Sequence, residues 1–232
     1  MTLLTIIQAV ADEIGLPRPA TVLSSTDPTV RQLLALANRE GKLLALRYPW
    51  QALTKEASFT TVAQESQGAL TAIAPDFARF RNDTMVDRAR AWPILGPLSA
   101  AEWQRSYGTG ASVDRFRVRG GAVLFTLVPA AGRTIHFEYL SRNWCRDAAA
   151  TTEREAWAAD DDAGILDEDL MALGVKWRFL KAKGLDYAEE FRDYEARLYD
   201  ARASDGGKPR LDVGADGAAR FGAAVPDGSW NL

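Results

Sequence analysis

The chain has 232 residues, of which 47% are hydrophobic, so it can bury one sizeable core or a main core with a smaller satellite. Its formal net charge of −3 argues against a general nucleic-acid binder, which usually carries a basic surface. A single cysteine, Cys145, excludes a disulfide within the chain and suits a reducing compartment. The apolar runs are short and the first residues lack a basic region and a cleavage site, so we expect no membrane span and no signal peptide.

Two amphipathic helices are expected in the first 50 residues. Gly15 ends the first helix, whose apolar residues recur in steps of three and four: Leu3, Ile6, Ile7, Val10 and Ile14. Asp27 and Pro28 open the second helix, because an aspartate accepts from free backbone N–H groups and a proline suits the first helical position. Gly41 lies on the apolar stripe of this helix, which indicates a close approach to another helix.

The middle of the chain changes to the alternation typical of strands. Residues 58–62 are predicted as a strand, and the spacing of Ser99 and Glu102 predicts a capped short helix. The clearest signal is three strand-like runs over residues 115–140, separated by Gly120-Gly121 and by a Pro-Ala-Ala-Gly turn. These runs predict a three-stranded meander, since paired glycines supply the positive φ angles of a tight hairpin. The pattern of residues 63–83 predicts no element.

Helical spacing returns at Asp167. Acidic residues near this start and lysines near the end at Gly184 both favour a helix dipole, and a second helix follows at once. The stripe expected to face inward on the first of these helices is Leu170, Leu173, Trp177 and Leu180. After Ser204, glycine, alanine and aspartate dominate, which predicts a flexible tail with two large aromatic residues, Phe221 and Trp230.

The fold class expected from these elements is α+β. Residues 1–50 and 145–203 are expected to form a small helical bundle, residues 51–144 a β-rich antiparallel insertion, and residues 204–232 a flexible C-terminal tail. Trp50 and Trp144 stand at the two crossings between bundle and insertion. Large apolar side chains at both crossings predict a pair of buried anchors, with a binding role as the alternative.

No residue pattern predicts catalysis, a cofactor or a metal. His136 is the only histidine, so a Ser-His relay or a histidine metal site has little to build on. The acidic residues 160–162 and 167–169 fail the spacing of a calcium loop, because Ile165 and Met171 occupy its glycine and glutamate positions. A solvated loop is the favoured interpretation, and weak attraction of cations is the alternative.

Arg115, Arg117 and Arg119 share one face of a predicted strand. Three like charges in a row need solvent or an acidic partner. They could contact phosphates or a neighbouring subunit, and the acidic balance of the whole chain favours a solvent or subunit face.

Three segments, in this order, resemble the head-to-tail adaptor (connector) proteins of tailed bacteriophages. They are a helix running into a tryptophan junction and a strand, DPTVRQLLALANREGKLLALRYPWQALTKEASFTT, a closing strand, TIHFEYLSRNW, and a helix pair, LDEDLMALGVKWRFLKAKGLDYAEEFRDYEARL. Together they span most of residues 1–203. None is a catalytic motif, and their order is more specific than any one of them.

The resemblance implies a structural virion protein, not an enzyme, that acts at the neck between head and tail after assembly in the host cytoplasm. Similar adaptors form a ring of twelve copies that docks on the portal, receives the tail nozzle or tail tube, and extends a channel through which DNA passes without specific binding. The tail with Phe221 and Trp230, and the face with Arg115, Arg117 and Arg119, are then candidate interfaces with portal or subunit. The alternatives are a wall hydrolase carried by a phage particle and a non-viral helical-bundle scaffold protein.

Overall fold

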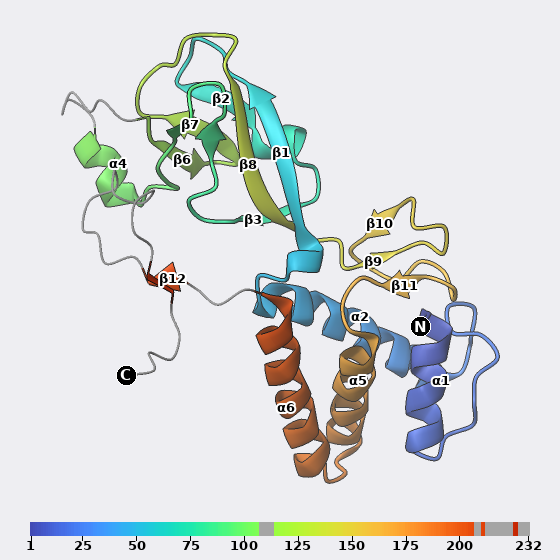
Figure 1. Ribbon diagram of the computed structural model, residues 1–232. Coiled ribbons are helices and arrows are strands. Elements are labelled where there is room, and N and C mark those ends of the chain that lie inside the picture. Colours follow the sequence, from blue (N-terminus) through green and yellow to red (C-terminus); the bar gives the residue numbers. More distant parts are fainter. Residues whose placement is uncertain (107–113, 207–209, 212–224, 227–232) are drawn as a thin grey trace, which may run out of the picture.

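The computed structural model describes residues 1–106, 114–206, 210–211 and 225–226 of the chain. The helices are α1 (Leu3–Glu13), α2 (Pro28–Arg47), α3 (Leu70–Ile73), α4 (Ala100–Ser106), α5 (Glu168–Lys183) and α6 (Ala188–Asp205), with a 3-10 turn at Gln51–Leu53. The strands are β1 (Thr54–Thr60), β2 (Ser66–Ala69), β3 (Phe77–Phe80), β4 (Val86–Asp87), β5 (Trp92–Pro93), β6 (Phe116–Arg119), β7 (Ala122–Phe125), β8 (Thr134–Ser141), β9 (Cys145–Arg146), β10 (Glu153–Arg154), β11 (Ala163–Gly164), β12 (Arg210–Leu211) and β13 (Val225–Pro226). The chain is therefore α+β, with helices before and after a β-rich middle (Figure 1).

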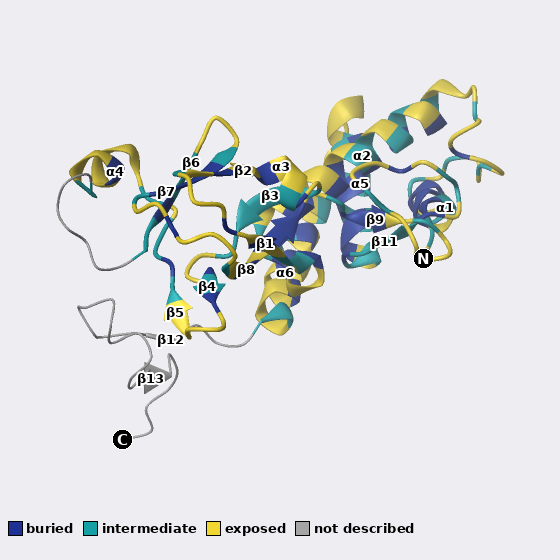
Figure 2. Cartoon of the chain, turned by 90° about the horizontal axis from the view of Figure 1, so that it is seen from above, coloured by how far each residue is buried: buried dark blue, intermediate teal, exposed yellow. Residues whose placement is uncertain are grey.

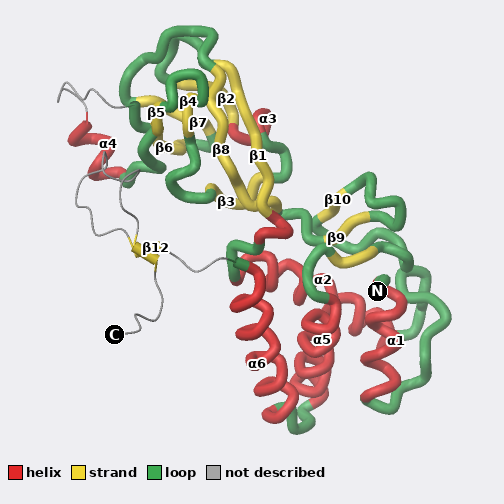
Figure 3. The backbone as a smooth tube through the Cα atoms, viewed as in Figure 1, coloured by secondary structure: helices red, strands yellow, loops and turns green. Residues whose placement is uncertain are grey.

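Two hydrophobic cores organise these elements. One belongs to the helical part, which comprises α1, α2, α5, α6 and the short strands β9, β10 and β11 (Figure 3). The other belongs to the β-rich part, which comprises β1 to β8 with α3 and α4. Figure 2 shows buried positions concentrated in α1 and where α2 and α5 meet, and alternating with exposed positions along the strands. The division of the chain into domains at residues 51 and 144 stays a prediction.

The ends of the helices follow the sequence signals. The Asp27 carboxylate accepts from Thr29 N at 2.6 Å at the start of α2, and the Asp167 carboxylate accepts from Leu170 N at 2.9 Å at the start of α5. Gly184 ends α5 with a φ of 72°, the left-handed conformation that glycine adopts without strain. The helix boundaries predicted from these residues are therefore confirmed.

The expected helical bundle is wrong. In Figure 1, α1, α5 and α6 run side by side, whereas α2 crosses their upper ends. The helix α5 packs against each of the other three. At the crossing, α5 approaches α2 closely because Gly174 leaves room for the Glu40 carboxylate of α2.

The predicted meander is also wrong in its third strand. The strands β6 and β7 form the expected hairpin around Gly120 and Gly121, whose φ angles are 59° and 76°. The strand β8 pairs instead with β1, β3 and β4, in a different sheet from β2, β7 and β6. Ile135, Phe137 and Tyr139 of β8 contribute to the same core as Val123 and Phe125 of β7. The two strands thus share a core between sheets, because side chains on alternate positions of β8 face it.

The buried face of α5 is rotated about the helix axis relative to the apolar face predicted from the sequence. The buried residues of this helix are Leu170, Met171, Gly174, Val175 and Phe179. Trp177 is only partly buried, and its ring lies against Phe191 at a centroid distance of 5.0 Å. The predicted flexible tail, residues 204–232, begins inside α6, and most of it lies outside the described residues.

A test of the close crossing is the substitution Gly174→Ala. A Cβ at this position would overlap the Glu40 carboxylate, which Arg178 and Tyr194 hold in place. Alanine favours an exposed helix by about 1 kcal/mol over glycine, whereas overpacking a core costs about 1–3 kcal/mol. We therefore expect a net loss of up to about 2 kcal/mol in urea unfolding. Gly164→Ala is the control, because its Cβ would meet the flexible Met171 thioether at 3.2 Å; equal effects would contradict the crossing.

Candidate interaction surfaces

The two crossings between the helical and the β-rich parts carry the buried tryptophans that the sequence predicts. Trp50 is 4% exposed and Trp144 is 0% exposed, and both belong to the core of the helical part. Trp50 Nε1 donates to the Leu44 carbonyl at 2.8 Å. A Cβ on Gly41 would overlap the Trp144 ring, so the glycine admits a tryptophan and not, as expected, another helix. The Trp144 ring therefore packs directly against the backbone of α2.

A polar cluster around Asp76 joins the two parts beside these tryptophans. Lys55 of β1 lies 2.6 Å from the Asp76 carboxylate and 2.5 Å from the Glu153 carboxylate of β10. Tyr139 and Ser141 of β8 donate to the two Asp76 oxygens at 2.6 and 2.7 Å. Burial opposes ionisation of Asp76, but the hydrogen bonds from Lys55, Tyr139 and Ser141 lower its pKa to about 2.

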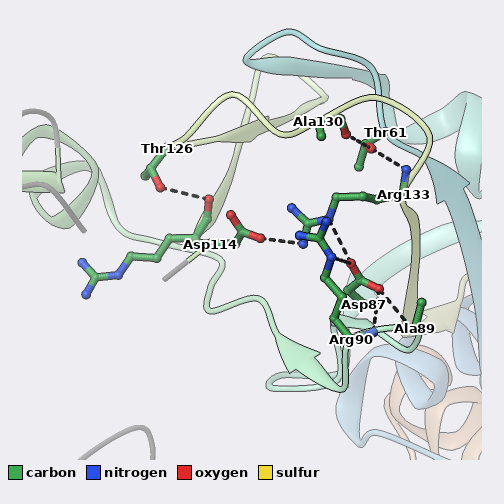
Figure 4. Close-up of polar contacts among 9 residues, drawn as sticks. Thr61, Asp87, Ala89, Arg90, Asp114, Thr126, Ala130 and Arg133 are labelled. Atoms are coloured by element: carbon green, nitrogen blue, oxygen red, sulfur yellow. Dashed lines mark hydrogen bonds and ion pairs between the residues drawn. The ribbon is translucent and has the colours of Figure 1, made fainter. Parts of the chain in front are cut away.

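A second polar cluster fixes the loops of the β-rich part. The Arg133 side chain, 10% exposed, donates to Asp87 at 2.9 Å and to Asp114 at 2.6 Å (Figure 4). The backbone N–H of Arg133 donates to the Thr61 hydroxyl, which in turn donates to the Ala130 carbonyl. Burial by itself raises the pKa of Asp87, but the hydrogen bond and charge of Arg133 outweigh it and hold this pKa below its usual value.

A buried acid on α2 is the ionisable core residue that the sequence analysis did not identify. Glu40 is 0% exposed; its carboxylate accepts from the Tyr194 hydroxyl at 2.6 Å and lies 2.6 Å from Arg178 Nη2. Burial raises the pKa of Glu40, and the two partners offset this only in part. The signal was an acid on the apolar stripe between Ala37 and Leu44, since such an acid needs a buried partner.

Arg115, Arg117 and Arg119, the three arginines predicted to share one face of a strand, lie on the same side of the chain because they alternate with residues that face the core. Arg117 and Arg119 belong to β6, and Arg115 directly precedes this strand. Phe116, between them in the sequence, is 2% exposed and faces the core. The Arg119 guanidinium lies 3.8 Å from the Glu65 carboxylate. Phe221 and Trp230, the other predicted interface residues, lie outside the described part of the chain.

The residues considered for metal or acid–base chemistry have structural partners. His136 Nδ1 lies 3.3 Å from the Glu56 carboxylate on the neighbouring strand β1. The Asp160 carboxylate accepts from the backbone N–H groups of Val22 and Leu23, and the buried Asp162 pairs with Arg154 at 2.7 Å. Within the described ranges, no three His, Cys, Asp or Glu side chains are placed to hold a metal ion. None of the helices in those ranges combines the length and apolarity needed to cross a bilayer.

The polar clusters described above join parts of the chain to one another. The model of the SU10 adaptor protein family matches residues 1–221. The chain therefore belongs to this family, a family of phage head-to-tail adaptors. It is a bacteriophage structural protein of the virion. No curated protein matches the chain.

The Arg133 cluster predicts a large effect of removing its cation. Arg133→Met leaves the Asp87 and Asp114 carboxylates without their shared partner, and breaking a buried pair in this way costs about 3–5 kcal/mol. Arg88→Met is the matched control: Arg88 pairs with Glu56, but the two side chains are 55% and 45% exposed, so its loss costs at most about 1 kcal/mol. Chemical unfolding of both variants measures the difference. Equal losses would show that the Arg133 cluster does not hold the loops.

The low pKa of Asp76 predicts a loss of stability in acid. Its pKa is about 2 in the folded chain against the usual 3.8, so the ionised form stabilises the fold above pH 3.8. This contribution, about 2 kcal/mol, disappears as the pH falls from 3.8 through 2. Asp76→Asn should therefore lose stability at pH 7 and show a flatter decline between pH 4 and 2 than the parent in urea unfolding. The control is Asp200→Asn, an exposed position of α6; a parental acid profile for Asp76→Asn would contradict the assignment.

Proposed function

We propose that this adaptor forms a ring, of twelve copies, that docks on the portal protein and receives the tail nozzle or tail tube. Membership of the SU10 adaptor protein family is the single observation that carries this proposal. The ring would extend the DNA channel of the neck, and its subunits would be made and assembled in the host cytoplasm. The acidic balance of the chain supports a channel through which DNA passes without being held.

The proposed role is structural and not enzymatic. The acids with shifted pKa values in the cores, Glu40, Asp76 and Asp87, each have a cationic partner and at least one further hydrogen bond within the described chain. Groups engaged in this way orient the chain. A catalytic acid or base would in addition have to face a position that a substrate can occupy.

The proposed contacts with portal or neighbouring subunits use the tail and the arginine face. Phe221 and Trp230 are the large aromatic residues in a stretch otherwise rich in glycine, alanine and aspartate. Aromatic anchors supply much of the binding energy at interfaces. Arg115, Arg117 and Arg119 add three cations on one side of β6, suited to an acidic partner surface.

Truncation of the tail tests the proposal. The truncation removes residues 207–232, because Asp205 accepts from the Gln51 backbone N–H and should be kept. The thermal midpoint should stay within about 2 °C of the parent, since every residue that the structure describes in the two cores precedes Gly206.

The binding assay uses DNA-filled heads from a phage that lacks this gene. Full-length protein should attach at the neck in electron micrographs and restore tail joining, and the truncated protein should do neither. Val225→Ala is a full-length control that keeps both aromatics. Parental attachment of the truncated protein would show that the tail is not the portal anchor, and no attachment of full-length protein would contradict the adaptor role at the neck.

A further inference from the structure

The outward face of α2 carries apolar residues and cations. An exposed helix face usually carries charges of both signs. Lys42 and Leu43 are three and four residues after Arg39, and Leu46 is four and three residues after them, which places all four on one side of the helix. Leu43 is 41% exposed and Leu46 is 53% exposed. Within the described chain, neither Arg39 nor Lys42 forms an ion pair. This face therefore offers apolar area and two uncompensated cations.

The same face forms one wall of a hollow between α2 and the β-rich part. The hollow has a volume of about 490 Å³, and its charged lining consists of four cations and one acid: Arg39, Lys42, Arg79, Arg142 and Glu155. Two atoms of lining residues, Arg79 Nη2 and Trp144 Nε1, are themselves buried and have no acceptor among the described residues. The excess of cations over acids in this lining favours an occupant rich in carboxylate oxygens. We call the α2 face and this hollow the cationic groove.

Complementary charges lie on the outward face of α6. Glu189, Asp193 and Asp200 are separated by four and seven residues, so they share one side of this helix, and all three are exposed. No ion pair within the described chain involves them, whereas Glu195 and Arg197 of the same helix do form such pairs. The helix α6 contributes no residue to the cationic groove of its own chain. The two surfaces therefore lie on different parts of one molecule.

We propose that the cationic groove of one copy binds the acidic face of α6 of a second copy. This contact would join two different surfaces. A bound pair therefore still presents one free groove and one free α6 face to further copies. Such a head-to-tail contact generates a ring when its rotation closes. The inference rests on the proposed ring and names the surfaces that would build it. Charge complementarity sets the orientation, and Leu43 and Leu46 supply the apolar area.

Cysteine cross-linking with a short bismaleimide tests the contact. Lys42→Cys and Asp193→Cys place one thiol in the groove and one on α6, and each substitution leaves the other like charges of its surface in place. The native Cys145 is buried, and burial foremost raises the pKa of its thiol to about 12, so it does not compete. A mixture of the two single variants should give cross-linked dimers, and the double variant should give a ladder of oligomers. Each single variant alone should stay monomeric, as should an Asp12→Cys/Asp193→Cys control.

The cross-linking is done both in phage particles and on purified protein at high concentration. Dimers from Lys42→Cys alone would overturn the proposal, because they indicate a contact between identical surfaces. The absence of a ladder in particles that contain the chain would overturn it as well, while the adaptor role stands. If the chain is missing from particles, the proposed function fails, and the purified mixture still decides the contact.

Charge reversal gives a second readout. Lys42→Glu or Asp193→Lys alone should lower cross-linking at a second pair, Leu46→Cys with Ala196→Cys, by at least about tenfold, as loss of a desolvated charge pair predicts. A mixture of the two reversed proteins should restore most of the signal. Failure of this restoration would contradict direct pairing of the two positions. Loss of duplex DNA binding in Lys42→Glu, without any cross-link in the parent, would instead identify the groove as a phosphate-binding surface.

Discussion

The contact between the Trp144 ring and the Gly41 backbone is the constraint on which the rest of the structure depends. The indole lies where a Cβ on residue 41 would be, so α2 can hold the returning chain only because this position lacks a side chain. A similar close contact occurs on α5, where the missing side chain of Gly174 leaves room for the Glu40 carboxylate. Two glycines on different helices thus let α2 cross α5 closely and receive the chain as it returns from the β-rich part.

This crossing makes the two cores depend on one another. The chain leaves α2 through Trp50 and returns through Trp144, and both side chains are buried in the core of the helical part. Lys55 then bridges the Asp76 and Glu153 carboxylates across the same junction, and Arg81 donates to the Pro49 carbonyl at 3.2 Å. An adaptor that joins two large assemblies needs its binding surfaces at a fixed orientation, and buried apolar anchors combined with half-buried, hydrogen-bonded ion pairs supply such an orientation.

Local signals in the sequence predicted local structure correctly. The helix caps and the hairpin turn depend only on residues that are close in the sequence, so a short segment is enough to predict them. Examples are Asp27, Asp167, Gly184 and the glycine pair of the β6–β7 hairpin. The family resemblance, carried by the order of three segments, was likewise confirmed.

Features that depend on distant partners were not predictable in the same way. The bundle failed because α2 crosses the ends of the other helices (Figure 1), and the meander failed because β8 pairs with β1, a strand some 80 residues earlier in the chain at Ser58↔His136. Glu40 finds Arg178 and Tyr194 on two helices from the other end of the chain. The cationic groove combines α2 with β3 and β8, so no single segment carries its charge pattern.

Hydrogen exchange at the junction tests most directly whether the two cores act as one unit. The backbone N–H of Trp144 donates to the Arg154 carbonyl, and the Trp144 carbonyl accepts from Ile165 N, so opening this segment requires the indole to leave Gly41. The account predicts that amides of residues 143–146 exchange as slowly as those in the buried turns of α2, at the rate of global unfolding. Exchange at the junction that is much faster than in both cores would show a hinge there, and would contradict the claim that the Gly41–Trp144 contact holds the molecule together.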